Sequence, residues 1–257
     1  MKGLLVVLLL AGCVGVNRPA PPASGSGTPA QVGADVVNRA RVHTELGATY
    51  YSRHRYEVAL EELGDALKAY PDYGPAYNML GLVYMDLKDD QKATQNFERA
   101  LRIDPKDPYA NNNYGWFLCQ HGQEKRSLDY FSVAQQNPLY NSREQSFVNS
   151  GVCSRRIKDD KAAELYFRQA LALQPMQGQA LYQLADINFE QAKFQEARSL
   201  LTRHMQAGSP GPEALWLGVR VENRLGDRDA EASFAAQLRR RFPDSKESKM
   251  LMSGERR

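Results

Sequence analysis

One pattern returns at an interval of 34 residues, and it constrains the fold more than any other feature of this chain. In the stretch 77–105 its apolar and small positions are Leu80, Gly81, Tyr84, Ala93, Phe97, Ala100 and Pro105. A shift of 34 residues toward the N-terminus meets Leu46, Gly47, Tyr50, Ala59, Leu63, Ala66 and Pro71. These offsets indicate two helices joined by a turn, because a small residue permits close helix approach and the proline ends the second helix.

Self-similarity at this period is typical of the tetratricopeptide repeat (TPR), and the sequence predicts six copies. The first two span about residues 40–71 and 74–105, and the later ones are marked by Gly115, Gly151, Ala185 and Gly218. The register slips by two residues before the fourth repeat, and we expect the loop 137–143 to absorb the slip. One repeat cannot bury its apolar face alone, so the six are expected to stack into an all-α, right-handed superhelix. The polar segment 245–257 suits a frayed or capping end.

The first thirteen residues indicate export. Lys2 precedes an apolar run from Gly3 to Ala11, which is too short to span a bilayer because spanning needs about 20 residues. The segment ending in Cys13 (Leu-Ala-Gly-Cys) resembles the lipobox of bacterial lipoproteins. That resemblance implies a signal peptide over residues 1–12, a lipidated Cys13 and, since Val14 replaces aspartate, sorting to the outer membrane. The alternatives are a cytoplasmic protein with an apolar start and a single membrane anchor.

Residues 13–38 are rich in proline, glycine, serine and alanine and have no periodic apolar face. Such a stretch cannot bury enough surface to offset the entropy lost on ordering, so we expect a flexible tether after the lipidated cysteine. A flexible chain of about 25 residues reaches roughly 25 to 30 Å. The TPR superhelical domain is expected over residues 39–257, held at the outer membrane by the lipid anchor and facing the oxidising periplasm.

The composition argues against nucleic acid as a partner, because the net charge is only +3 and the charges are spread evenly. The four histidines are scattered, and the sequence contains no paired-histidine metal helix, nucleophile elbow or phosphate loop. We therefore expect neither an enzyme nor a cofactor or metal site.

The first helix of each repeat is expected to line the groove of the superhelix. Counting from the repeat starts gives a partner-binding groove made of Tyr51, Asn78, Leu82, Met85, Tyr109, Asn112 and Trp116. Apolar and aromatic side chains with amides between them suit an amphipathic helix or an extended peptide. Asn78 and Asn112 occupy equivalent positions and are candidates to hydrogen-bond the backbone of a guest. The alternative is that some of these side chains only pack between repeats.

The run from Asn111 to Cys119 (Asn-Asn-Asn-Tyr-Gly-Trp-Phe-Leu-Cys), together with the lipobox, the repeats and Cys153, supports a narrower resemblance. The chain resembles the type IV pilus biogenesis lipoprotein family, the pilotins of the outer-membrane pilus secretin. The resemblance implies a protein that binds the secretin subunit, carries it to the outer membrane and supports assembly of the multimeric pore.

Cys119 and Cys153 are 34 residues apart, which is one repeat, and both fall on first helices. In an oxidising compartment this spacing favours a disulfide between neighbouring repeats, and members of the family resembled carry such a bridge. Two buried free thiols are the alternative.

Two other functions stay open from the sequence. One is a general periplasmic TPR scaffold that serves envelope assembly or cell-wall enzymes and ignores the secretin. The other is an enzyme-associated or substrate-holding protein, which a closed pocket with converging polar groups would favour.

Overall fold

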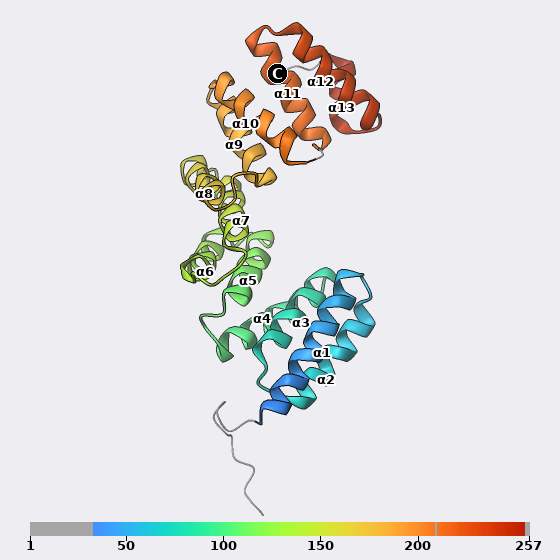
Figure 1. Cartoon of the computed structure of the whole chain (residues 1–257), viewed down its shortest axis with the longest axis vertical. Coiled ribbons are helices and arrows are strands. Elements are labelled where there is room, and N and C mark those ends of the chain that lie inside the picture. The colour runs from blue at the N-terminus through green and yellow to red at the C-terminus, as the bar shows by residue number, and fades with distance from the viewer. Residues whose placement is uncertain (1–32, 209, 255–257) are drawn as a thin grey trace, which may run out of the picture.

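The structure is a computed structural model that describes residues 33–208 and 210–254, and these residues form thirteen helices in an extended arc (Figure 1). The first seven are α1 (Ala34–Ser52), α2 (Tyr56–Ala69), α3 (Gly74–Asp86), α4 (Asp90–Ile103), α5 (Pro108–Gln120), α6 (Glu124–Gln136) and α7 (Arg143–Arg156). The others are α8 (Asp160–Leu173), α9 (Gly178–Glu190), α10 (Phe194–Ala207), α11 (Pro212–Leu225), α12 (Arg228–Arg241) and α13 (Lys246–Ser253). Six consecutive helix pairs, α1/α2 to α11/α12, correspond to the six predicted repeats, so the all-α repeat fold is confirmed.

The N-terminal boundary differs from the expected one. Helix α1 begins at Ala34, although the tether was expected to run to residue 38. Asp35 lies in the first turn, where a carboxylate favours the helix dipole, and Arg39 pairs with it one turn later at 3.1 Å. The predicted signal peptide, Cys13 and the tether up to residue 32 lie outside the described residues.

Close contact between the two helices of a repeat depends on a residue without bulk on the first helix. A Cβ added at Gly81 or Gly151 would lie 2.5 Å from the ring of the phenylalanine on the second helix, Phe97 or Phe167. No real Cβ tolerates that distance, so glycine is required for the aromatic ring to reach the core. In the fifth repeat Ala185 replaces the glycine, and a leucine replaces the phenylalanine. The two substitutions compensate in volume.

The predicted slip between the third and fourth repeats lies in the α6–α7 connection. This loop has six residues, 137–142, whereas the α4–α5 loop has four, 104–107. Tyr140 anchors the longer loop, because its buried ring packs edge-on against Tyr109 with the ring centroids 4.9 Å apart. The repeat packing therefore continues through the insertion without a break.

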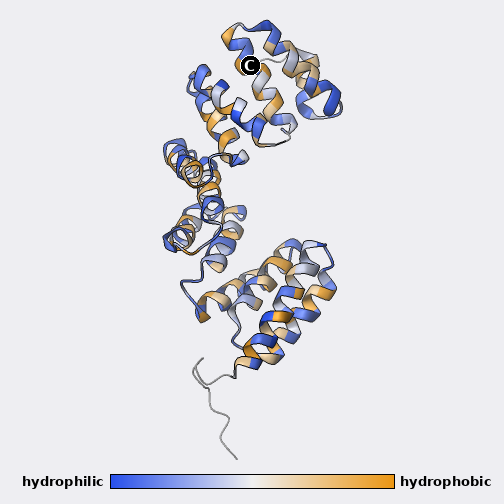
Figure 2. Cartoon of the chain, viewed as in Figure 1, coloured by the Kyte–Doolittle hydropathy of each residue, from blue (hydrophilic) through white to orange (hydrophobic). Residues whose placement is uncertain are grey.

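The contacts between helices define an inner and an outer side of the arc. Each second helix packs on the first helix of its own repeat and of the next repeat, while the first helices also contact one another in the pairs α1–α3, α3–α5, α5–α7 and α9–α11. The first helices therefore gather on the inner side. Apolar and hydrophilic residues alternate along the helices, as amphipathic packing on more than one side requires (Figure 2). Helix α13 covers α11 and α12 and closes the C-terminal end, as a capping segment would.

Candidate functional site

The seven predicted groove residues all lie on first helices, on α1, α3 and α5. Tyr51, Leu82, Met85 and Trp116 are half-buried, so each presents part of an apolar or aromatic side chain to the surface. Tyr109 is the most open of the seven, with 46% of its surface exposed. The inner side of the first three repeats therefore offers separate apolar contacts rather than a closed cavity.

The hydroxyl of Tyr51 lies beside the carboxylate of Asp86, which also accepts a hydrogen bond from Tyr56 at 3.3 Å. Burial and the Asp86 charge raise the pKa of Tyr51 well above the ordinary value of a phenol. The Tyr51 hydroxyl is therefore neutral at physiological pH. Because its one hydrogen is directed at Asp86, the hydroxyl offers an acceptor lone pair at the N-terminal end of the groove.

Side-chain amides form a hydrogen-bonded ladder across the inner side. The Nδ2 atom of Asn113 donates to Oδ1 of Asn78 at 3.1 Å, joining α5 to α3. Asn149 Nδ2 donates to Asn112 Oδ1, also at 3.1 Å, joining α7 to α5. Asn112 Nδ2 also donates to Asn113 Oδ1 at 3.4 Å. This bond connects the α3–α5 hydrogen bond to the α5–α7 hydrogen bond.

The ladder continues beyond the fourth repeat. Gln145 donates to Asn149 Oδ1 at 3.0 Å, and Gln177 donates to Gln145 at 3.5 Å. The oxygen of Gln177 caps α9 by accepting from the backbone of Ala180. Asn78 and Asn112, the predicted partners of a guest backbone, thus have their side-chain oxygens occupied by a neighbouring repeat. Their amide groups are buried, and they fix the spacing of the first helices.

The structure contains the disulfide between Cys119 and Cys153 that the sequence favoured, with the two Cα atoms 5.9 Å apart. Both residues are fully buried and pack against Phe131, with Trp116 at the edge of this cluster. Arg156 covers the cluster from outside. It donates to the backbone oxygen of Cys119 at 2.7 Å, and its guanidinium lies 5.8 Å from the centroid of the Trp116 ring.

The ion pairs of the fourth to sixth repeats were not predicted from the sequence. Arg155 pairs with Asp186 at 2.7 Å and with Glu190 at 2.8 Å, and thereby ties α7 to α9. The sequence did contain an indication of these ion pairs, because Asp186 and Glu190 are four residues apart and therefore lie on the same face of α9. In the last repeats Arg198 on α10 pairs with the buried Glu222 on α11.

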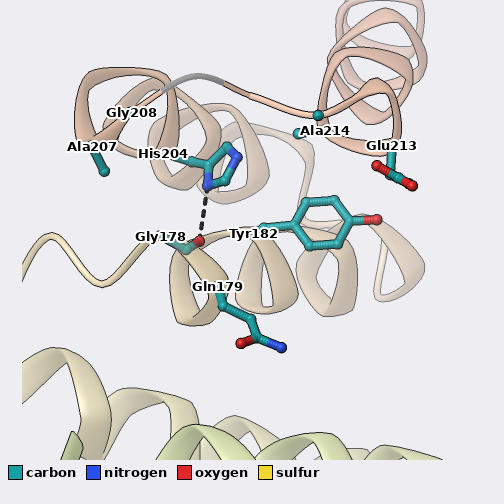
Figure 3. A pocket seen from close by; sticks show the side chains of 9 residues that line it. Gly178, Gln179, Tyr182, His204, Ala207, Gly208, Glu213 and Ala214 are labelled. Carbon is teal, nitrogen blue, oxygen red and sulfur yellow. Dashed lines mark hydrogen bonds between the residues drawn. The ribbon is translucent and has the colours of Figure 1, made fainter. Parts of the chain in front are cut away.

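A cavity of about 340 Å³ opens between α9, α10 and α11 (Figure 3). Tyr182 and His204 form one wall, with their ring centroids 5.9 Å apart, and Glu213 stands at the start of α11. His204 Nδ1 lies 2.8 Å from the backbone oxygen of Gly178. Burial, followed by the negative charges of Asp186 and Glu213, raises the pKa of Tyr182 to about 12. Its hydroxyl is therefore neutral at physiological pH.

No group of three or more histidine, cysteine, aspartate or glutamate side chains within residues 33–208 and 210–254 is placed to hold a metal ion. In that same part of the chain, no helix has both the length and the apolar character needed to cross a membrane.

Comparison with known proteins gives matches at the level of the repeat and of the whole chain. One tetratricopeptide repeat model matches residues 44–108 and 160–212, and a second matches residues 96–129. The type IV pilus assembly protein PilF of Pseudomonas aeruginosa is 28% identical over 247 residues, which cover 96% of each chain. These matches are to the tetratricopeptide repeat and to a protein of type IV pilus assembly.

Two solved structures extend the match to three dimensions. The structure of Pseudomonas aeruginosa PilF superposes with a TM-score of 0.81 at 27% identity, covering 86% of this chain and all of that one. The structure of PilW, described as a widely conserved type IV pilus biogenesis factor, superposes with a TM-score of 0.75 at 30% identity. It covers 83% of this chain and 98% of PilW.

Proposed function

Because the chain belongs to the PilF/PilW family of TPR proteins of type IV pilus assembly, we propose that it is the pilotin of the pilus secretin. In this role it binds the secretin subunit, brings it to the outer membrane and promotes assembly of the multimeric pore. The partner-binding surface is the groove formed by the seven predicted residues on α1, α3 and α5.

The observation that carries the proposal is the composition of this groove. Half-buried apolar and aromatic side chains, such as Leu82, Met85 and Trp116, alternate with buried amides along three neighbouring helices. A helix or extended segment of a partner can bury the apolar groups, which is the usual mode of recognition by such a surface. Aromatic and methionine side chains are also the types enriched in protein interfaces.

The groove is pre-organised, and this supports a binding role. The amide ladder fixes α3, α5 and α7 relative to one another, and the disulfide links α5 to α7 covalently. A surface that is already ordered loses less conformational entropy when a partner binds, so more of the contact energy appears as affinity.

The membrane part of the proposal depends on Cys13, which we assign as the lipidated residue that holds the protein in the outer membrane, facing the periplasm. The tether that follows would let the repeat domain reach a subunit before it is assembled. Replacing Cys13 by alanine should release a folded protein from the outer-membrane fraction, as measured by fractionation and circular dichroism. Recovery of the variant in that fraction would contradict the lipid anchor.

The test of the whole proposal is the state of the secretin in a strain that lacks this protein. We expect the secretin to remain monomeric or to miss the outer membrane, as seen by fractionation and by electrophoresis that preserves the multimers. Normal multimers in the outer membrane would overturn the pilotin role and leave a general envelope scaffold.

Groove variants then locate the surface. Trp116→Ala should weaken secretin binding in a pull-down and restore few multimers in the deletion strain, because it removes the largest apolar side chain of the groove. Leu165→Ala is the control, since Leu165 is exposed on α8, a second helix on the outer side. Equal loss of binding in both variants would place the surface elsewhere. Circular dichroism shows whether each variant folds.

A further inference from the structure

The cavity between α9, α10 and α11 is lined mainly by residues with small side chains, among them Gly178, Ala207, Gly208, Gly211 and Ala214 (Figure 3). A Cβ placed on Gly208 would meet no atom within 4 Å, so the space beside it is open. The volume of about 340 Å³ falls within the range of pockets that hold ligands or buried side chains. The cavity lies in the fifth and sixth repeats and shares no residue with the predicted groove.

The cavity is lined by groups that can donate, the Gln179 amide and the Tyr182 hydroxyl, and by acceptors on His204 and Glu213. The backbone oxygen of Gly178 can only accept, so His204 Nδ1 carries the hydrogen of their 2.8 Å bond. In the neutral ring the other nitrogen, Nε2, is then an acceptor. It points away from Gly178, toward the side of the cavity on which Tyr182 and Glu213 lie (Figure 3).

Glu213 is exposed in the first turn of α11 and supplies a negative charge that forms no ion pair within the described residues. Burial is the main cause of the raised pKa of Tyr182; the charges of Asp186 and Glu213 add to it, and Arg155 and Arg220 oppose it. No lysine or arginine is among the residues that line the cavity. An aromatic face, an imidazole acceptor and a carboxylate together favour a cation, and a planar one uses the ring of Tyr182 best.

We propose that this cavity binds an arginine side chain from an extended segment of a partner protein. The guanidinium stacks on the ring of Tyr182 and donates hydrogen bonds to the Glu213 carboxylate and to His204 Nε2. Arginine fits better than lysine because its flat group carries five donors in fixed directions, whereas an ammonium is a point charge. The proposal goes beyond secretin binding in the groove and does not depend on it.

The experiment uses the full chain labelled with ¹⁵N and three short peptides, each with a blocked N-terminus and an amidated C-terminus. Their sequences are Gly-Arg-Gly, Gly-Lys-Gly and Gly-citrulline-Gly, where citrulline has the shape of arginine without its charge. Saturable shifts of the amide signals of Gly178, Gly208 and Gly211 report binding at the cavity. We expect the citrulline peptide to bind at least ~10-fold more weakly, since charge-assisted hydrogen bonds are lost.

Two variants and one control tie binding to the cavity. Glu213→Gln should weaken the arginine peptide ~10-fold with little change in shape, for the same loss of charge. Glu196→Gln removes a carboxylate from the equivalent first turn of α10, outside the cavity lining, and should leave the affinity unchanged. Gly208→Leu should abolish binding by filling the open space. Leucine can adopt the extended backbone at this position.

Several results would overturn the proposal. Equal binding of the arginine and citrulline peptides would remove the role of the charge, and equal binding of the lysine peptide would remove the assignment to arginine. Equal effects of Glu213→Gln and Glu196→Gln, or an absence of saturable shifts at the three glycines, would remove the site. None of these results bears on the secretin, so the two proposals stand or fall separately.

Discussion

Two junctions between neighbouring first helices use the same pair of positions but close them with different chemistry. Each first helix has a close-packing glycine or alanine, and positions are counted from it. The first member of the pair lies four residues after this glycine or alanine on one helix, and the second member lies two residues after the corresponding residue on the next first helix. In the disulfide junction, between α5 and α7, the pair is Cys119 and Cys153. In the arginine junction, between α9 and α11, it is Phe189 and Arg220, whose guanidinium lies 4.2 Å from the centroid of the Phe189 ring.

The difference between the junctions shows how one repeat architecture obtains unequal stiffness. The disulfide junction is covalent, buried, and crossed by the amide ladder, so its two helices are held at several points. The arginine junction has no covalent link; it is held by apolar packing of Phe189 with Leu217 and Val221 and by one cation over one ring. Arg220 Nε is buried without a hydrogen-bond partner in the described part of the chain. Stability in a stack of repeats depends on such neighbouring interfaces. We therefore expect the middle of the arc to open last and the C-terminal end to open first.

The largest effect should follow loss of the disulfide. Replacing both Cys119 and Cys153 by alanine removes a link that closes a loop of 34 residues, and we expect a loss of about 3 to 4 kcal/mol in the free energy of unfolding. Denaturation with urea measures it, and the wild-type protein treated with a reductant should shift by a similar amount. An unchanged midpoint would show that the ladder alone holds the junction. Hydrogen exchange should quicken mainly in α5 to α8.

The amide ladder gives the next effect. Asn149→Ala deprives Asn112 Oδ1 and Gln145 Nε2 of their partner, and a buried unsatisfied amide costs about 1 to 3 kcal/mol. We expect a loss of about 2 kcal/mol, measured by the same denaturation. The cost should grow when the disulfide is also absent, because both hold the same pair of helices. Strictly additive effects would mean that the ladder and the disulfide act independently.

The sequence predicted the architecture well because the repeat spacing reports contacts within one repeat. The glycine of one helix meets the aromatic residue of the next, as for Gly81 and Phe97, and this contact requires only local geometry. The two-residue slip before the fourth repeat was also predictable from the sequence, because a loop can accommodate inserted residues and a packed core cannot. The spacing of Cys119 and Cys153 favoured the disulfide for a related reason, since residues one repeat apart occupy equivalent positions on adjacent first helices.

The side-chain networks between repeats were less predictable. Asn78 is a plausible partner for a guest backbone until the structure places Asn113 against it from the next repeat. The long side chain of Arg155 could reach several acids, and its selection of Asp186 depends on the angle between α7 and α9. Such choices depend on rotamers and helix crossing, which the 34-residue period does not encode.

A smaller effect is expected from the ion pair beside the arginine junction. Glu222 is almost fully buried, with 5% of its side chain exposed, whereas 34% of the Arg198 side chain is exposed. Glu222→Gln should cost about 1 to 2 kcal/mol, less than for a fully buried pair, because water already screens the arginine. Denaturation at low and high salt tests this. The difference in the free energy of unfolding between variant and wild type should shrink in 1 M salt, because the Debye length there is about 3 Å and the charges are screened. No dependence on salt would mean that the loss comes from packing.

The smallest effect should come from Arg220→Met, which keeps the apolar stem and removes the cation. The cation–π contact contributes about 0.5 to 1 kcal/mol, but the variant also removes a buried N–H that has no partner, so the net change should stay within about 0.5 kcal/mol. Arg224→Met is the control, because Arg224 lies on the same helix, 5.9 Å from the Phe194 ring, and is exposed.

Similar denaturation midpoints for both variants would support a weak junction. A loss above about 2 kcal/mol for Arg220→Met alone would exceed a cation–π contact, so the arginine would have to be paired in solution. The C-terminal end would then be as firmly held as the middle, and the contrast between the two junctions would fail.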